Sequence, residues 1–181
     1  TLAASYTHNL EGLGNIEYGR TSAEGSYYWT KWLPRYHVLK SQVRGTYSPE
    51  NRSIYKGTTT AGGDYLSSSI NSPYVVRGYP LAEFVGWSLM TTSLEYRFPI
   101  WYIYQGPGTA PFFSKRLHGA VFWDTITAQG AYYHSDKSGL KRTELGTFFS
   151  GYGAELRYDF TLGYFAPITL RVGYHHGEKA K

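Results

Sequence analysis

Apolar and polar residues alternate with a period of two through most of the 181-residue chain, and this pattern predicts a β-sheet. In SLEYRF (93–98), for example, Leu, Tyr and Phe share one face, and Ser, Glu and Arg share the other. Turn-rich stretches separate the alternating segments. Seven strands are predicted, at residues 1–9, about 25–33, 37–48, about 87–99, 117–127, 150–160 and 168–175. Strands of this length can cross a lipid bilayer when they are tilted.

Two features favour a membrane barrel with a polar lumen over a soluble sandwich. Connections alternate in length: residues 34–36 are a short link, whereas 49–86 and 132–148 are long. Segment 101–116 fits less well, because it should be a short turn and is long. Aromatic residues also gather near strand ends, as in the girdles of outer-membrane barrels: Trp29, Trp32, Trp87, Trp101, Tyr102 and Tyr104.

Seven strands is an odd count, whereas single-chain bacterial barrels have an even number. We therefore expect residues 1–181 to be the C-terminal portion of a larger antiparallel transmembrane β-barrel. The closing strands would lie outside this chain, since an open sheet edge in lipid leaves backbone groups unpaired.

Composition narrows the function classes. The chain has no cysteine, which excludes disulfides, thiolate metal sites and cysteine nucleophiles. Mean hydropathy is −0.41, and no apolar run reaches the roughly 18 residues that a membrane helix needs. Its 19 Tyr and 5 Trp suit a boundary between oil and water. The net charge of +5 is scattered rather than clustered, so we expect no nucleic-acid partner.

The sequence SPYVVRGYP (72–80) lies in the longest connection, yet it is too apolar for a solvated loop. Arg77 carries a permanently charged, fork-shaped group that can bridge two carboxylates. Gly78 permits a tight turn and a close approach of the backbone. Alternation places Asp124 opposite the bulky Val121 and Trp123, so Asp124 faces the lumen if those two face lipid. These residues predict that the loop folds into the barrel.

Three elements in this order, VVRGYP (75–80), SLEYRFPI (93–100) and GAVFWDT (119–125), resemble the C-terminal barrel of the BamA/TamA-like outer-membrane assembly family, the bacterial surface antigens. In that family, a loop tip inserted into the lumen meets acidic residues on the inner wall. The resemblance assigns the tip to Val76, Arg77, Gly78 and Tyr79. It assigns the wall carboxylates to Glu95 and Asp124.

The resemblance also implies a barrel of about 16 strands, with loop 49–86 in its lumen and periplasmic domains outside this chain. Such a protein inserts or translocates proteins at the bacterial outer membrane, through a seam between its first and last strands. The expected partners are outer-membrane lipid, an unfolded outer-membrane protein or passenger domain, and accessory subunits of an assembly complex.

Other functions stay open. A small outer-membrane pore or adhesin barrel would show the same alternation, with the long loops as binding surfaces. An outer-membrane enzyme would have only His134 and Asp136 to support it, and consecutive residues of HSD (134–136) cannot form a triad. His175 and His176 point to opposite faces of a strand and make a poor chelate. We therefore expect no catalytic residue, no metal and no cofactor.

Overall fold

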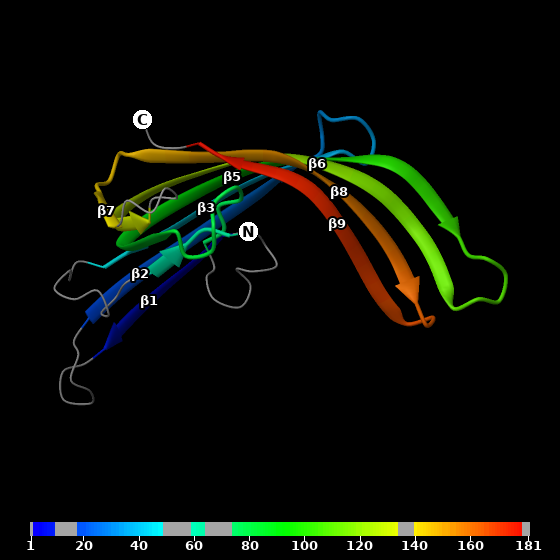
Figure 1. The fold of residues 1–181 in the computed structure, drawn as a ribbon, viewed down its shortest axis with the longest axis horizontal. Coiled ribbons are helices and arrows are strands. Elements are labelled where there is room, and N and C mark those ends of the chain that lie inside the picture. Colours follow the sequence, from blue (N-terminus) through cyan, green and yellow to red (C-terminus); the bar gives the residue numbers. More distant parts are fainter. Residues whose placement is uncertain (1, 10–17, 49–58, 64–73, 134–139, 179–181) are drawn as a thin grey trace.

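The computed structural model describes residues 2–9, 18–48, 59–63, 74–133 and 140–178. These form one antiparallel sheet in which seven strands pair in the order β1-β2-β3-β5-β6-β8-β9, while β4 pairs with β5 and β7 with β6 (Figure 1). The strands are β1 (Leu2–Asn9), β2 (Tyr18–Trp29), β3 (Val38–Tyr47), β4 (Thr59–Ala61), β5 (Phe84–Gln105), β6 (Phe112–Tyr133), β7 (Leu140–Thr143), β8 (Phe148–Leu162) and β9 (Ala166–Gly177). The all-β antiparallel prediction is confirmed for these residues.

The seven principal strands correspond in order to the seven predicted segments, but the boundaries of β2, β5 and β6 were wrong. β2 lies at Tyr18–Trp29 rather than 25–33, because its first half is polar on both faces and carries no alternation. Segment 101–116 is not a long connection: β5 continues to Gln105, β6 begins at Phe112, and only 106–111 link them. Register shifts at Pro99/Trp101 and Tyr102/Gln105 interrupt the period of two there, which concealed the strand.

β1 and β9 lie at the two ends of the pairing order and do not pair with each other, so the described sheet is open. No helix in the described part of the chain is long and apolar enough to cross a membrane.

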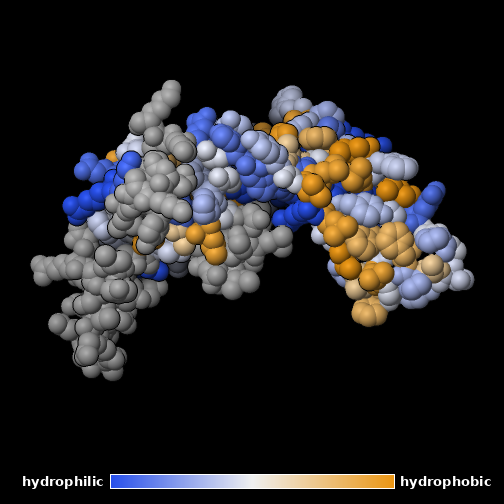
Figure 2. All heavy atoms as spheres, viewed as in Figure 1, coloured by the Kyte–Doolittle hydropathy of each residue, from blue (hydrophilic) through white to orange (hydrophobic). Residues whose placement is uncertain are grey.

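The two faces of the sheet differ in chemistry. We call the face that carries Glu95 and Asp124 the inner face and the opposite one the outer face. On the outer face, apolar side chains of neighbouring strands are exposed, and Figure 2 shows such atoms gathered over the limb that β8 and β9 form. They include Leu94, Val121, Trp123, Leu156, Leu170, Val172 and Tyr174. On the inner face, polar side chains are buried, among them Gln42, Thr46, Thr91, Glu95, Asp124, Glu155 and Arg157.

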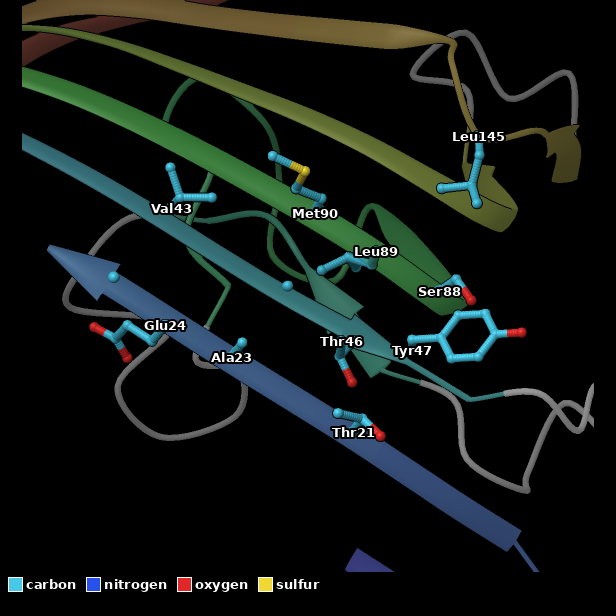
Figure 3. Close-up of a pocket in the computed structure, with 12 residues that line it drawn as sticks. Thr21, Ala23, Glu24, Val43, Thr46, Tyr47, Ser88, Leu89, Met90 and Leu145 are labelled. Atoms are coloured by element: carbon cyan, nitrogen blue, oxygen red, sulfur yellow. The ribbon is translucent and has the colours of Figure 1, made fainter. Parts of the chain in front are cut away.

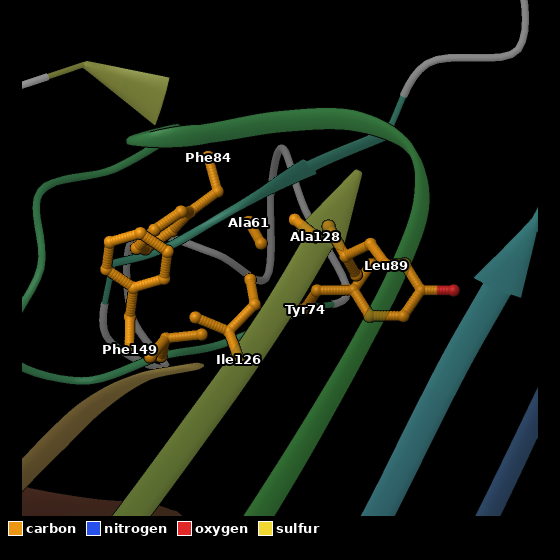
Figure 4. Packing of buried hydrophobic residues seen from close by; sticks show 8 residues of the cluster. Ala61, Tyr74, Phe84, Leu89, Ile126, Ala128 and Phe149 are labelled. Carbon is orange, nitrogen blue, oxygen red and sulfur yellow. The ribbon is translucent and has the colours of Figure 1, made fainter. Parts of the chain in front are cut away.

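The curved sheet has a hollow side, and the described parts of the connection between β3 and β5, residues 59–63 and 74–83, lie there (Figure 1). Of the predicted inserted loop 49–86, residues 49–58 and 64–73 lie outside the described part. In the remainder, Tyr74 and Val76 bridge to Ala61 and Gly63. Buried apolar residues from this connection and from β5, β6 and β8 pack together into the hydrophobic core (Figure 4). That core consists of Ala61, Tyr74, Val76, Phe84, Leu89, Ile126, Ala128 and Phe149.

Candidate functional site

Residues 76–79 form a loop tip that is held against the inner face. Val76 is fully buried in the core, which fixes the residue before Arg77. On the far side of the tip, the Gly63 amide donates to the Tyr79 carbonyl at 3.0 Å. The tip is therefore anchored on both sides of Arg77, and its position does not depend on the arginine alone.

Arg77 is completely buried and is bonded to two strands at once. Its Nε donates to Asp124 Oδ2 at 2.7 Å and its Nη2 to Asp124 Oδ1 at 2.8 Å, which is the bidentate fork geometry of strong arginine–carboxylate pairs. Its Nη1 donates to Glu95 Oε2 at 2.7 Å. The backbone amide of Arg77 adds a bond to Asp124 Oδ2 at 3.1 Å, so the carboxylate orients both the side chain and the backbone of the tip.

Ser93 and Phe122 complete the surroundings of the guanidinium. Ser93 Oγ donates to Asp124 Oδ1 at 2.7 Å and accepts from Arg77 Nη2 at 3.3 Å. The Phe122 ring lies under the guanidinium, with Arg77 Cζ 3.5 Å from the ring centroid. A desolvated cation over an aromatic face gains electrostatic energy from the ring, so an apolar side chain on the inner wall contributes to holding the charge.

A second layer of charges surrounds the first. Glu95 Oε1 bonds to Arg97 and lies 3.2 Å from Arg157 Nη2. Arg157 in turn donates from Nε to Glu155 Oε2 at 2.8 Å, and Glu155 Oε1 lies 3.6 Å from Arg77 Nη1. Three arginines thus share the Glu95 carboxylate, and the network extends from β5 to β8.

The tip lies directly on the backbone of β8 and β9, where two glycines face each other. Gly151 and Gly177 are register partners. A Cβ at Gly151 would lie 1.9 Å from the Arg77 carbonyl oxygen, and one at Gly177 would lie 2.6 Å from the Gly78 oxygen. Gly78 itself has φ +96° and its Cβ position is 2.6 Å from His176 backbone atoms, so a side chain there is excluded by both strain and space.

Tyr79 extends this contact to the ends of the last two strands. Its hydroxyl donates to the Ser150 carbonyl at 3.0 Å and also contacts the Glu178 carbonyl. Its ring packs edge-on against Phe84, with centroids 5.1 Å apart. Burial, with a smaller effect of the Glu178 and Glu83 carboxylates, raises the pKa of Tyr79 to about 12, so the phenol stays a neutral donor.

The structure brings the sequence-predicted residues Arg77, Glu95 and Asp124 into direct contact, and places Gly78 and Tyr79 on the neighbouring strands. Val76 lies in the core rather than on the wall. Sequence reasoning missed Glu155 and Arg157 as members of the same network. Their signal was present, because both oppose the apolar Ala154, Leu156 and Tyr158 in the alternation of GAELRY (153–158).

Other candidates offer less. His134 and Asp136 lie outside the described residues. His175 Nε2 is 3.3 Å from Glu155 Oε1, whereas His176 is exposed. In the parts of the chain that the structure describes, no cluster of His, Cys, Asp or Glu could hold a metal ion.

A depression of about 530 Å³ lies among β2, β3 and β5, with Leu145 at its end (Figure 3). Its lining is almost wholly apolar, and its single charged side chain, Glu24, already accepts bonds from Gln42 and Arg44. The depression therefore shows no convergent polar groups of the kind that orient a small ligand.

No family model, no curated protein and no solved structure matches this chain. The geometry of the site and the sequence motifs that form it therefore carry the assignment of function.

Proposed function

We propose that the chain belongs to an outer-membrane β-barrel of about 16 strands that inserts or translocates proteins at the bacterial outer membrane, and that its buried loop tip braces the barrel wall. The observation that carries the proposal is the complete burial of Arg77 between carboxylates of two adjacent strands. No covalent chemistry is involved.

The distribution of side chains supports contact with lipid. Soluble proteins rarely expose continuous apolar patches of more than a few hundred Å². Here the outer-face row Tyr96, Val121, Ala154 and Tyr174 runs across four paired strands, and Trp123 and Leu156 flank it. Charged groups are buried on the opposite face. This is the reverse of a soluble sandwich and is typical of a barrel with a polar lumen.

The ion network supports a bracing role. Removing one partner of a buried ion pair leaves an uncompensated charge, at a cost of roughly 3–5 kcal/mol. A solvated loop does not need such an ion network, whereas a loop that must keep a fixed position on the barrel wall is held there by it. Arg77 ties β5 to β6, and Gly78 and Tyr79 lie on β8 and β9, so one tip connects four successive strands.

The function of the brace follows from the resemblance to assembly barrels. A seam between the first and last strands would open and template incoming strands by edge pairing. The tip would keep the wall beside the seam in shape while the seam is open. Accessory subunits and the substrate would bind outside the residues described here.

The test is charge reversal at the tip. Arg77→Glu places a third carboxylate beside Glu95 and Asp124, and we expect loss of assembly of other barrel proteins in cells. Asp124→Arg in the same chain should restore part of the activity. Arg142→Glu, the same change at an exposed position on β7, is the matched control and should leave assembly unchanged. Normal barrel assembly and growth with Arg77→Glu would exclude the brace.

The same experiment separates assembly from a pore or adhesin function. A pore predicts that Arg77→Glu alters conductance or ligand binding while other outer-membrane proteins still assemble. Measuring both ion conductance of the purified protein and the amounts of other barrel proteins in the membrane distinguishes the two.

A further inference from the structure

The inner face carries an excess of positive charge between the loop tip and the short turns 106–111 and 163–165. Five cationic side chains occupy this region on β3, β5, β6, β8 and β9, and we call them the cationic wall: Lys40, Arg97, Arg116, Arg157 and Arg171. Within the described part of this region, they are accompanied by the carboxylates Glu95, Glu155 and Asp159, while Asp124 is occupied by Arg77. Because Arg77 also draws on Glu95 and Glu155, the carboxylates do not neutralise the wall.

Arg171 is the clearest sign that the wall is not an internal charge ladder. It is the register partner of Arg157, so two like charges face each other across β8 and β9. Like charges directly opposite in a sheet are destabilising. Arg157 is compensated by Glu95 and Glu155, whereas Arg171 is exposed and forms no ion pair with any described residue. Within the described sheet, Arg171 therefore adds a positive charge that no described carboxylate pairs with.

The other members of the wall are also crowded by cations. Arg97, Arg44 and Arg77 lie near Lys40, and its register partner Glu95 offsets them in part. Arg97 keeps 37% of its side chain exposed and Arg116 keeps 51%, although each contacts one carboxylate. Their guanidinium groups therefore retain unused donors on the hollow side of the sheet.

We propose that the cationic wall binds an extended acidic polypeptide segment. The wall crosses five adjacent strands, a width of about 19 Å at the usual strand spacing. A single small anion would engage two or three of these groups, whereas an extended peptide presents a carboxylate on the same side about every 7 Å. The partner is thus a chain with repeated Asp or Glu residues, held in the hollow beneath the loop tip.

This inference goes beyond the assembly role and does not require it. Peptide binding is measured without any assembly reaction, so its failure leaves the brace untouched. Conversely, an Arg77 variant that folds but is inactive in assembly should still bind the acidic peptide through the cationic wall.

The probe is a fluorescently labelled hexaglutamate peptide, titrated by anisotropy against the protein in neutral detergent micelles. Arg171→Ala should weaken binding about two- to fivefold, as expected for an exposed ion pair. Lys40→Ala removes a half-buried charge of the wall and should weaken binding as well. Arg171→Lys should retain most of the affinity. Raised salt should weaken peptide binding by the wild-type protein, because exposed charges are screened. Arg142→Ala removes the same charge from β7 and is the matched control.

Equal binding by wild type and the Arg171→Ala, Lys40→Ala double variant would overturn the proposal, as would equal binding of a hexaglutamine peptide. A phosphorylated glycolipid that binds through these residues, while hexaglutamate does not, would also overturn it and would assign the wall to lipid head groups. Heat-dependent gel mobility and circular dichroism identify variants that fail to fold, and the comparison of hexaglutamate with hexaglutamine on the wild type keeps the test decisive in that case.

Discussion

Gly151→Ala is the sharpest perturbation of the loop tip that the structure offers, because it changes neither charge nor any residue of the tip. The added Cβ would lie 1.9 Å from the Arg77 carbonyl oxygen, whereas ordinary van der Waals contact begins at 3.4 Å. The atom that it meets belongs to the backbone, which cannot rotate away. The tip must therefore retreat by about 1.5 Å, or β8 must bend by a similar amount.

A retreat of that size breaks the bonds that hold the arginine. The contacts from Arg77 Nε and N to Asp124 Oδ2 are 2.7 and 3.1 Å long, and both would exceed hydrogen-bond range. We expect a loss of about 3 kcal/mol in the free energy of unfolding, at the lower end for a broken buried ion pair because water can enter the gap. The assay is urea unfolding in micelles, followed by tryptophan fluorescence.

Gly45→Ala is the matched control, since its Cβ would meet only Leu89 O at 3.8 Å. This substitution should change stability by less than about 0.5 kcal/mol. In an Arg77→Met background, Gly151→Ala should cost less than it does alone, because the side-chain bonds it disrupts are already gone and only the backbone bond to Asp124 remains. Equal urea midpoints for Gly151→Ala and Gly45→Ala would refute the proposed tip geometry.

Three further predictions test other parts of the site. Asp124→Asn should destabilise the protein more than Glu155→Gln in the same urea titration, because Asp124 accepts three bonds from Arg77 and Glu155 lies 3.6 Å away; the reverse order would contradict the assignment. Since the pKa of Tyr79 is raised to about 12 from an unfolded value near 10, its stabilisation is complete below pH 10 and declines as pH rises toward 12. Tyr79→Phe should reduce that decline, and an unchanged pH profile of stability in this variant would show that Tyr79 is not its cause. Val121→Lys on the outer face should reduce the stability of the folded protein in lipid vesicles by roughly 2–4 kcal/mol at mid-bilayer depth, and so lower the yield of folded protein. Folding that equals wild type would argue against lipid contact.

The alternation of the sequence was enough to assign faces, because the side-chain period of a strand is two. It placed Val121 and Trp123 opposite Asp124, and both are exposed on the outer face while Asp124 is buried. Alternation failed where the backbone leaves the regular period. The register shifts between Pro99 and Gln105 concealed the end of β5, and the polar start of β2 gave no pattern to follow.

The site was only partly visible in the sequence for a different reason. Carboxylates near an arginine can be proposed from phase and order, but which of them meet it depends on strand register across long connections. Glu155 lies beyond the connection 134–147, so its distance from Arg77 could not be inferred. The contact between Gly151 and the backbone of Arg77 could not be predicted either, since a glycine that makes room for distant backbone has no local sequence signature.

The position of the tip in the chain has a consequence for the order of folding. Arg77 precedes β5, β6, β8 and β9 in sequence, yet the carboxylates that bind Arg77 and the backbone that receives Gly78 belong to those later strands. Burying the guanidinium before Asp124 and Glu95 are in place would leave its charge without a partner. Docking of Gly78 also requires the backbone of β9 beneath it. The tip therefore cannot dock fully before β9 has paired with β8, so its docking reports that the strands from β5 to β9 are in place.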